Sequence, residues 1–136
     1  MNRVNDVDLP ELFRSCRTIA VVGLSNDQQK LSYGVASYMQ QAGYRIIPVN
    51  PFVPEILGEK SYASLADIPE AVDIVNVFRK PEAVGPIAED AVAIGAKCLW
   101  LQEEVVNVYA AELAAKAGLM VIMDKCILKE HWSIAS

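Results

Sequence analysis

Short apolar runs alternate with amphipathic stretches along most of the 136-residue chain. Five runs have the length of a buried strand, and they cover residues 19–22, 44–50, 72–78, 96–101 and 119–123. Apolar runs without polar alternation are typical of strands covered on both faces. Several of the stretches between them carry apolar residues at helical spacing. This alternation predicts an α/β fold, a single Rossmann-like domain of three layers with a mostly parallel sheet between helices.

Helical spacing places the other elements before and between the strands. Helices are predicted at residues 8–16, 35–42, 81–94 and 106–117. Because proline fits only the first turn of a helix, Pro86 favours a start near Gly85 for the third of them. A short helical turn is expected at 64–69, and the residues after Asp124 are predicted to form a short polar tail.

Composition describes an ordinary globular domain. Hydrophobic residues make up 53% of the chain and charged residues 21%, which excludes a disordered chain. We expect one domain over residues 1–136, with a helical segment at 1–17 packed on it. The net charge of -5 argues against nucleic acid as a partner, because a phosphate backbone needs a basic face. A small anionic ligand needs only a few local donors.

The sequence shows no pattern typical of a targeting signal or of a metal site. No apolar run reaches the length of a membrane span, and the first residues lack the apolar core of a signal peptide. The three cysteines, Cys16, Cys98 and Cys126, show no metal or redox spacing, as is typical of the reducing cytoplasm. We therefore expect a cytoplasmic protein. His131 is the single histidine, and no metal site is predicted. A homodimer is left open.

The stretch 18–39 carries the most informative chemistry. A buried strand ends at Gly23, a polar loop follows, and an amphipathic helix comes next. This is the first half of a βαβ unit, whose turn holds phosphate through free amides and the positive end of the helix dipole. Lys30 and the hydroxyls of Ser25 and Ser32 can add contacts to an anion. The stretch predicts a diphosphate site for a nucleotide-type ligand, although an ordinary strand-to-helix turn with a capping serine explains the same glycine and serine.

Two common nucleotide motifs fit this loop poorly. A dinucleotide fingerprint needs three glycines after the first strand and an acidic residue after the second, whereas only Gly23 is present and Asn50 ends the second strand. A P-loop needs glycine before its lysine and a hydroxyl residue after it, but Gln29 and Leu31 flank Lys30. An anion site on the first loop remains, with the cations Arg79 and Lys80 beside it. Coenzyme A, which has a diphosphate and an adenine ring, fits such a site.

Polar side chains follow each predicted strand. Because parallel strands end at one edge of a sheet, these side chains are expected to line a common cleft. Tyr33, beside the first loop, is expected to touch a ligand better than Trp100, which lies within a strand. The strand-end residues predicted to line the cleft are Ser25, Asn26, Lys30, Asn50, Arg79, Lys80 and Gln102.

Segments spread over residues 18–131 are similar to a known family. The chain resembles the small CoA-binding-domain proteins, whose fold is similar to the nucleotide-binding domain of the succinyl-CoA synthetase alpha subunit. Each matching segment is short and weak by itself, but the order and spacing of the segments along the chain make the resemblance specific. They are AVVGLS (20–25), KLSY (30–33), GYRIIPVNP (43–51), LG (57–58), SLADIP (64–69), VFR (77–79), GAK (95–97), LW (99–100), MDKC (123–126) and EH (130–131).

The resemblance implies a ligand and a set of contacts. Carried over by position, the residues that would hold phosphate are Gly23, Leu24, Ser25, Lys30 and Ser32. Those that would line the nucleotide and pantetheine path are Asn50, Pro51, Phe78 and Arg79. The family commonly has glycine two residues after its post-strand glutamine, whereas this chain has Glu104 there. A side chain and a negative charge at that position would narrow the cleft or repel an acyl-CoA carboxylate.

Two main classes of function follow from these observations, and a third, a partner-binding subunit whose ligand site regulates association, lacks the long exposed apolar stripe that would support it. The first is non-enzymatic binding of coenzyme A or an acyl-CoA at the glycine-containing strand–loop–helix. The alternative is an NAD(P)- or CoA-thioester-dependent enzyme, or a redox or ligand sensor. The missing glycines and the lack of a nucleophile with an obvious base disfavour the second class. No catalytic residue is predicted, and Cys126 and His131 are assigned to packing of the C-terminus.

Overall fold

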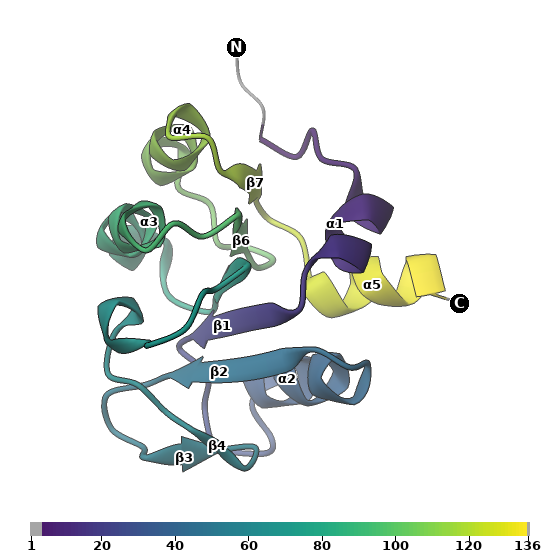
Figure 1. Cartoon of the computed structure of the whole chain (residues 1–136), viewed down its shortest axis with the longest axis vertical. Helices are drawn as coiled ribbons and strands as arrows, with labels where there is room; N and C mark the ends of the chain where they lie inside the picture. Colours follow the sequence, from purple (N-terminus) through teal and green to yellow (C-terminus); the bar gives the residue numbers. More distant parts are fainter. Residues whose placement is uncertain (1–3, 136) are drawn as a thin grey trace.

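A five-stranded parallel sheet forms the centre of the computed structural model, which describes residues 4–135 (Figure 1). The strand order is β2-β1-β5-β6-β7, so the chain changes direction across the sheet between β1 and β5. Such a switch point opens a crevice outside the carboxyl ends of the strands. The strands are β1 (Thr18–Val22), β2 (Arg45–Val49), β5 (Ile74–Val77), β6 (Cys98–Leu101) and β7 (Met120–Ile122).

Helices cover both faces of this sheet, as Figure 1 shows. One face packs against α1 (Leu9–Ser15), α2 (Leu31–Gln41) and α5 (Ile127–Ala135). The other packs against α3 (Val84–Ala93), α4 (Val108–Lys116) and the short 3₁₀ turn η1 (Leu65–Asp67). A second 3₁₀ turn, η2 (Pro81–Ala83), leads into α3. The predicted three-layer Rossmann-like fold is confirmed.

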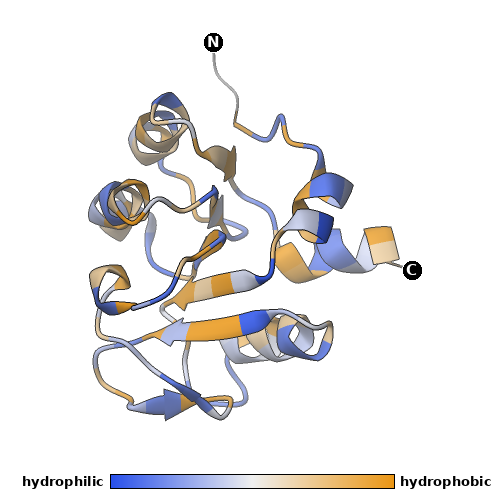
Figure 2. Cartoon of the chain, in the orientation of Figure 1, coloured by the Kyte–Doolittle hydropathy of each residue, from blue (hydrophilic) through white to orange (hydrophobic). Residues whose placement is uncertain are grey.

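Alternate residues of each strand enter different cores. In β1, Ala20 and Val22 belong to the α3–α4 core, while Ile19 and Val21 belong to the α1–α2–α5 core. Both faces are therefore apolar, and β1 and β2 are largely orange in Figure 2. Trp100 is fully buried and donates its indole N–H to the carbonyl of Lys125 at 2.8 Å, so it belongs to the core, in keeping with its predicted place within a strand. No helix within residues 4–135 has the length and hydropathy needed to cross a bilayer.

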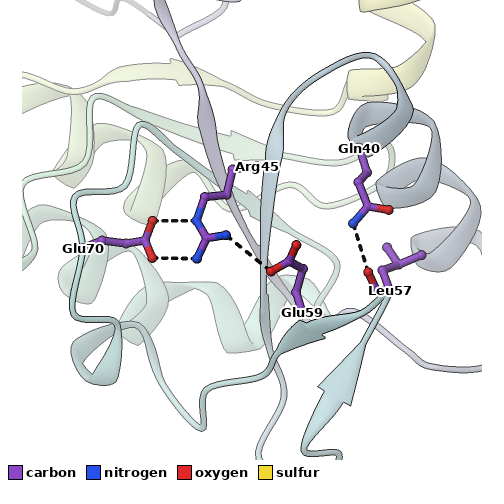
Figure 3. Close-up of polar contacts among 5 residues, drawn as sticks. All are labelled: Gln40, Arg45, Leu57, Glu59 and Glu70. Atoms are coloured by element: carbon purple, nitrogen blue, oxygen red, sulfur yellow. Dashed lines mark hydrogen bonds and ion pairs between the residues drawn. The ribbon is translucent and has the colours of Figure 1, made fainter.

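The edge strand β2 carries a small hairpin, formed by β3 (Glu55–Ile56) and β4 (Glu59–Lys60). Figure 3 shows how it is tied down. Arg45 donates two hydrogen bonds to Glu70, at 2.7 and 2.8 Å, and one to Glu59 at 3.3 Å. Gln40 donates to the carbonyl of Leu57 at 3.0 Å. These contacts tie the β3–β4 hairpin to β2 through Arg45 and to α2 through Gln40.

Two local predictions need correction, and a third is confirmed. The residues after Asp124 form the helix α5 and not a polar tail, because Ile127 is fully buried and His131 packs edge-on against Phe13. The helix predicted to begin at Val106 begins instead at Val108, as α4, and the Val106 side chain is exposed. The start expected near Gly85 is confirmed: α3 begins at Val84 after the turn η2, so Gly85 and Pro86 lie in its first turn, as proline requires.

Candidate functional site

A cleft of about 340 Å³ lies at the carboxyl ends of β1 and β2. The end of β5, the turn η1 and helix α3 complete its wall, so it occupies the switch point of the sheet. Ligands bind at this place in open α/β sheets. The cleft is lined by Val22, Gly23, Val49, Asn50, Pro51, Phe52, Ala63, Ser64, Leu65, Arg79, Ile87 and Asp90.

Gly23 lets the loops after β1 and β5 approach one another closely. Its φ of +87° lies in the left-handed region, where a side chain is strained. A Cβ built at this position would lie 2.5 Å from the carbonyl oxygen of Phe78 and 2.9 Å from Cδ of Arg79. The glycine predicted as a phosphate-loop residue is therefore required by the backbone, because the space that a side chain would need is filled by Phe78 and Arg79.

The loop after Gly23 is held together by its own hydroxyl and carboxylate groups. The backbone N–H of Ser25 donates to Oγ of Ser32 at 3.1 Å, and Oγ of Ser25 accepts from the N–H of Asp27 at 3.0 Å. Asp27 in turn accepts from the N–H of Gln29 at 2.9 Å. The oxygens of the two serines predicted to hold phosphate thus accept hydrogen bonds that order the loop, and each hydroxyl proton remains to be donated.

Ser25 and Ser32 lie outside the cleft lining, and so do the remaining residues predicted on this loop. Asn26 and Lys30 are exposed, and Lys30 precedes α2 as its N-cap without a capping side-chain hydrogen bond. Leu24 is fully buried, so it can offer a ligand only its backbone. Tyr33 is half-buried and packs against the α1–α2–α5 core.

Asn50 connects the ends of β1 and β2. Its Nδ2 donates to the carbonyl of Leu24 at 3.0 Å, and its Oδ1 accepts from the N–H of Phe52 at 2.8 Å. The second bond closes a turn around Pro51, in which an asparagine side chain substitutes for a backbone carbonyl. This turn carries the Phe52 side chain, which is 89% exposed at the rim of the cleft.

Arg79 and Asp90 give the cleft one positive and one negative side chain. Within residues 4–135 neither makes an ion pair or a side-chain hydrogen bond, with the other or with any third residue. Both charges are therefore available to a ligand. Lys80 is exposed at the start of η2 and does not line the cleft, while Phe78 is half-buried against the α1–α2–α5 core.

Gln102 is buried and has a structural role that the sequence did not reveal. Its Oε1 accepts from Nδ2 of Asn76 at 3.1 Å and from the N–H of Ile127 at 3.0 Å, which joins β5 and β6 to the start of α5. Its Nε2 has no hydrogen-bond partner among the described residues. Gln102 is not part of the cleft lining, so the structure does not bring it together with Asn50 and Arg79.

Glu104 adopts a conformation that favours glycine. Its φ is +69°, and its N–H donates to Oδ1 of Asp124, itself at φ +63°, over 2.7 Å. The turn thus supplies a backbone reason for a glycine at this position. Glu104 is exposed and does not line the cleft.

Several lining residues were missed by sequence reasoning. Phe52 directly follows the Asn-Pro pair that was recognised, so its position was a usable signal. Ser64 directly precedes η1, and Ile87 and Asp90 lie on α3. Only the tertiary packing brings these two elements to the ends of β1 and β2. Of the predicted set, the cleft brings together Gly23, Asn50, Pro51 and Arg79.

The fold and the cleft together define a small Rossmann-like α/β domain with a ligand-sized crevice at its switch point. A family model described as a CoA binding domain matches residues 17–132. The chain belongs to this CoA-binding domain family, as its resemblance predicted.

Known proteins of two kinds are similar to this chain: small proteins of nearly the same length, and a much longer ligase subunit that matches over a part of its length. Uncharacterized protein YneT of Bacillus subtilis is 40% identical over 131 residues, which cover 96% of this chain and 97% of that protein. A hypothetical protein from Pyrococcus horikoshii has a solved structure with a TM-score of 0.94 and 33% identity, over 100% of this chain and 96% of that one. The alpha subunit of ADP-forming acetate–CoA ligase II from Pyrococcus furiosus is 40% identical over 68 residues. That match covers 49% of this chain and 15% of the ligase subunit.

Proposed function

We propose that this protein binds coenzyme A or an acyl-CoA without transforming it, with the diphosphate beside the loop after β1. The observation that carries the proposal is the cleft at the switch point, in a chain of the CoA-binding domain family. Gly23 lets the loops after β1 and β5 pack together at this wall, and the unpaired Arg79 supplies a positive charge there. Guanidinium–phosphate contacts are strong because they are charge-assisted and can be bidentate.

The start of α2 supports the same placement. This helix has eleven residues, and no side chain caps its first turn. Its first backbone N–H groups and the positive end of its dipole favour an anion at this end. Lys30, exposed at the N-cap, adds a flexible positive side chain. We expect it to reach the ligand from outside the cleft.

The buried thiols do not favour the enzyme or redox-sensor alternative. Cys16, Cys98 and Cys126 are buried, and burial raises the pKa of the Cys16 and Cys98 thiols. A raised pKa keeps a thiol in its unreactive protonated form. His131 accepts or donates a hydrogen bond with the hydroxyl of Tyr38 at 2.9 Å and packs among aromatic rings. Free thiols also support the expected location in the reducing cytoplasm.

A thermal-shift comparison tests the proposal. CoA, dephospho-CoA, NAD, NADP and ATP are added at equal concentration, and the melting temperature is recorded for each. A ligand at one hundred times its Kd stabilises the native state by about 2.7 kcal/mol, so selective binding of CoA gives the largest shift. A larger shift with NAD or NADP, or no shift with any of these compounds, would overturn the proposal.

Charge-removing variants test where the diphosphate lies. Arg79→Ala and Lys30→Ala are each expected to weaken CoA binding by about 1–3 kcal/mol, the range for hydrogen bonds to charged groups. Lys116→Ala is the matched control, because this lysine ends α4 shortly before β7 begins, at the edge of the sheet opposite the strand ends that form the cleft. Unchanged affinity in Arg79→Ala, measured by calorimetry, would contradict the placement.

A further inference from the structure

The Phe52 ring occupies an unusual position for a large apolar side chain. It is 89% exposed, and it borders both the 340 Å³ cleft and a second cleft of about 380 Å³, which is lined by residues 50–54, Ser61 and Ala63. Burying a phenylalanine side chain stabilises a protein by about 1.5–3 kcal/mol, and here that gain is left unused. A planar ligand group placed against the ring would recover it.

The segment that carries Phe52 is fixed before any ligand arrives. Asn50 holds the N–H of Phe52 at 2.8 Å, and Ser61 donates its hydroxyl to the carbonyl of Asn50 at 3.2 Å, across the two ends of the segment. The hairpin between them is tied to Arg45 and Gln40 (Figure 3). An aromatic group on an ordered loop binds with little loss of conformational freedom. The backbone that carries Phe52 is thus ordered in advance, and it presents the ring at the rim of the cleft.

Asp90 adds a chemical preference to this site. At neutral pH a carboxylate only accepts hydrogen bonds, and Asp90 lines the same cleft as Phe52 without a partner among residues 4–135. Apolar side chains, Leu65 and Ile87, complete the wall. The cleft therefore suits a ligand with an anionic group for Arg79, a flat ring for Phe52, and an N–H donor for Asp90.

We propose that Phe52 and Asp90 select the base of the bound nucleotide, a purine with an amino group at C6. Phe52 stacks on the ring, and Asp90 accepts a hydrogen bond from the amino group. Hypoxanthine has a carbonyl oxygen at the same carbon, and two acceptors facing one another repel. This inference rests on the proposed function, and it adds base selection by two residues that sequence reasoning did not assign.

Calorimetric titration with ADP and inosine diphosphate measures this selection, because the two differ only in the base. Wild-type protein is expected to bind ADP about tenfold more tightly, as for one discriminating hydrogen bond. Asp90→Asn is expected to bring the two affinities together, since an amide can donate to the hypoxanthine oxygen. Glu89→Gln, the neighbouring exposed acid on α3 that does not line the cleft, is the matched control.

Substitutions at Phe52 test whether its ring stacks on the base. Phe52→Leu keeps an apolar side chain and is expected to raise the Kd of both diphosphates and of CoA about tenfold, the scale of one base–aromatic stack. The ratio between the diphosphates should not change. Phe52→Tyr should retain the wild-type affinity, and Tyr109→Leu, which removes an exposed ring from α4, should have no effect. The exposure of Phe52 means that the melting temperature without ligand should stay constant.

The outcomes separate this inference from the proposed function. CoA binding with equal affinity for the two diphosphates, or with no effect of Phe52→Leu, overturns base selection and leaves the proposed function standing. An adenine preference that persists in Asp90→Asn removes Asp90 from the assignment. If wild-type protein binds neither ADP nor CoA, both are wrong.

Discussion

The close approach at Gly23 leads to a quantitative prediction for Gly23→Ala. A left-handed φ costs a residue with a side chain about 1–2 kcal/mol. The new methyl group would also lie 2.5 Å from the carbonyl oxygen of Phe78, which is backbone and cannot move aside as a flexible side chain can. Forcing an extra methyl group into a packed site typically costs a further 1–3 kcal/mol, as an order of magnitude. We therefore expect Gly23→Ala to lower the free energy of unfolding by about 2–5 kcal/mol.

Two other glycines separate these two contributions. Gly118 has φ +98°, but a Cβ added there would meet nothing within 4 Å, so Gly118→Ala should show the conformational cost alone, about 1–2 kcal/mol. Gly34 lies inside α2 with neither a positive φ nor a neighbour within 4 Å. Gly34→Ala should stabilise the protein by about 0.4–1 kcal/mol, because alanine is the better helix residue and restricts the unfolded chain.

Urea unfolding followed by circular dichroism gives all three values under one set of conditions. Domains of this size typically have a stability of about 5–15 kcal/mol, so the Gly23 variant should remain folded enough to measure. Equal destabilisation in Gly23→Ala and Gly118→Ala would refute the reasoning, since it would mean that the loops after β1 and β5 are free to separate. A stabilised Gly23 variant would refute it more strongly.

The remaining predictions concern stability away from the cleft. Glu104→Gly should raise the free energy of unfolding by about 1–2 kcal/mol, because it relieves a left-handed φ of +69°. Glu104→Ala, which keeps the strain, should not, and an equal effect of the two variants in urea titrations would contradict this. For Asp73, burial alone would raise the pKa of its carboxyl, but hydrogen bonds from the N–H groups of Arg17 and Thr18, at 2.7 and 3.1 Å, lower it below its ordinary value. Its stabilising contribution is therefore present above the ordinary pKa of about 3.8 and is lost as pH falls through the lower native value. Asp73→Asn should flatten acid unfolding in this range, and an unchanged pH profile would count against the assignment. Ile127→Ala should cost about 2–5 kcal/mol, because this side chain is fully buried at the start of α5; a loss below about 1 kcal/mol would show that α5 is not part of the core.

The sequence by itself determined the sheet and the nature of the first loop. Buried strands must be apolar on both faces, so β1 shows an unbroken run from Ile19 to Val22. Gly23 was recognisable because a tight strand-to-helix turn is a local requirement of the backbone. Family membership was also predictable, since it rests on the order of short motifs along the chain.

The tertiary structure alone decided which side chains share the cleft. Asp90 and Ile87 lie on α3, far along the chain from the end of β2, and nothing local to them indicates a site. Gln102 shows the converse: its place after a strand suggested a ligand contact, but packing assigns its oxygen to Asn76 and α5. The C-terminal helix was missed because only Ile127 along it is fully buried, and its place depends on packing against α1 and α2. Hydrophobic periodicity depends on which faces are covered, and those faces become known only when the elements are assembled.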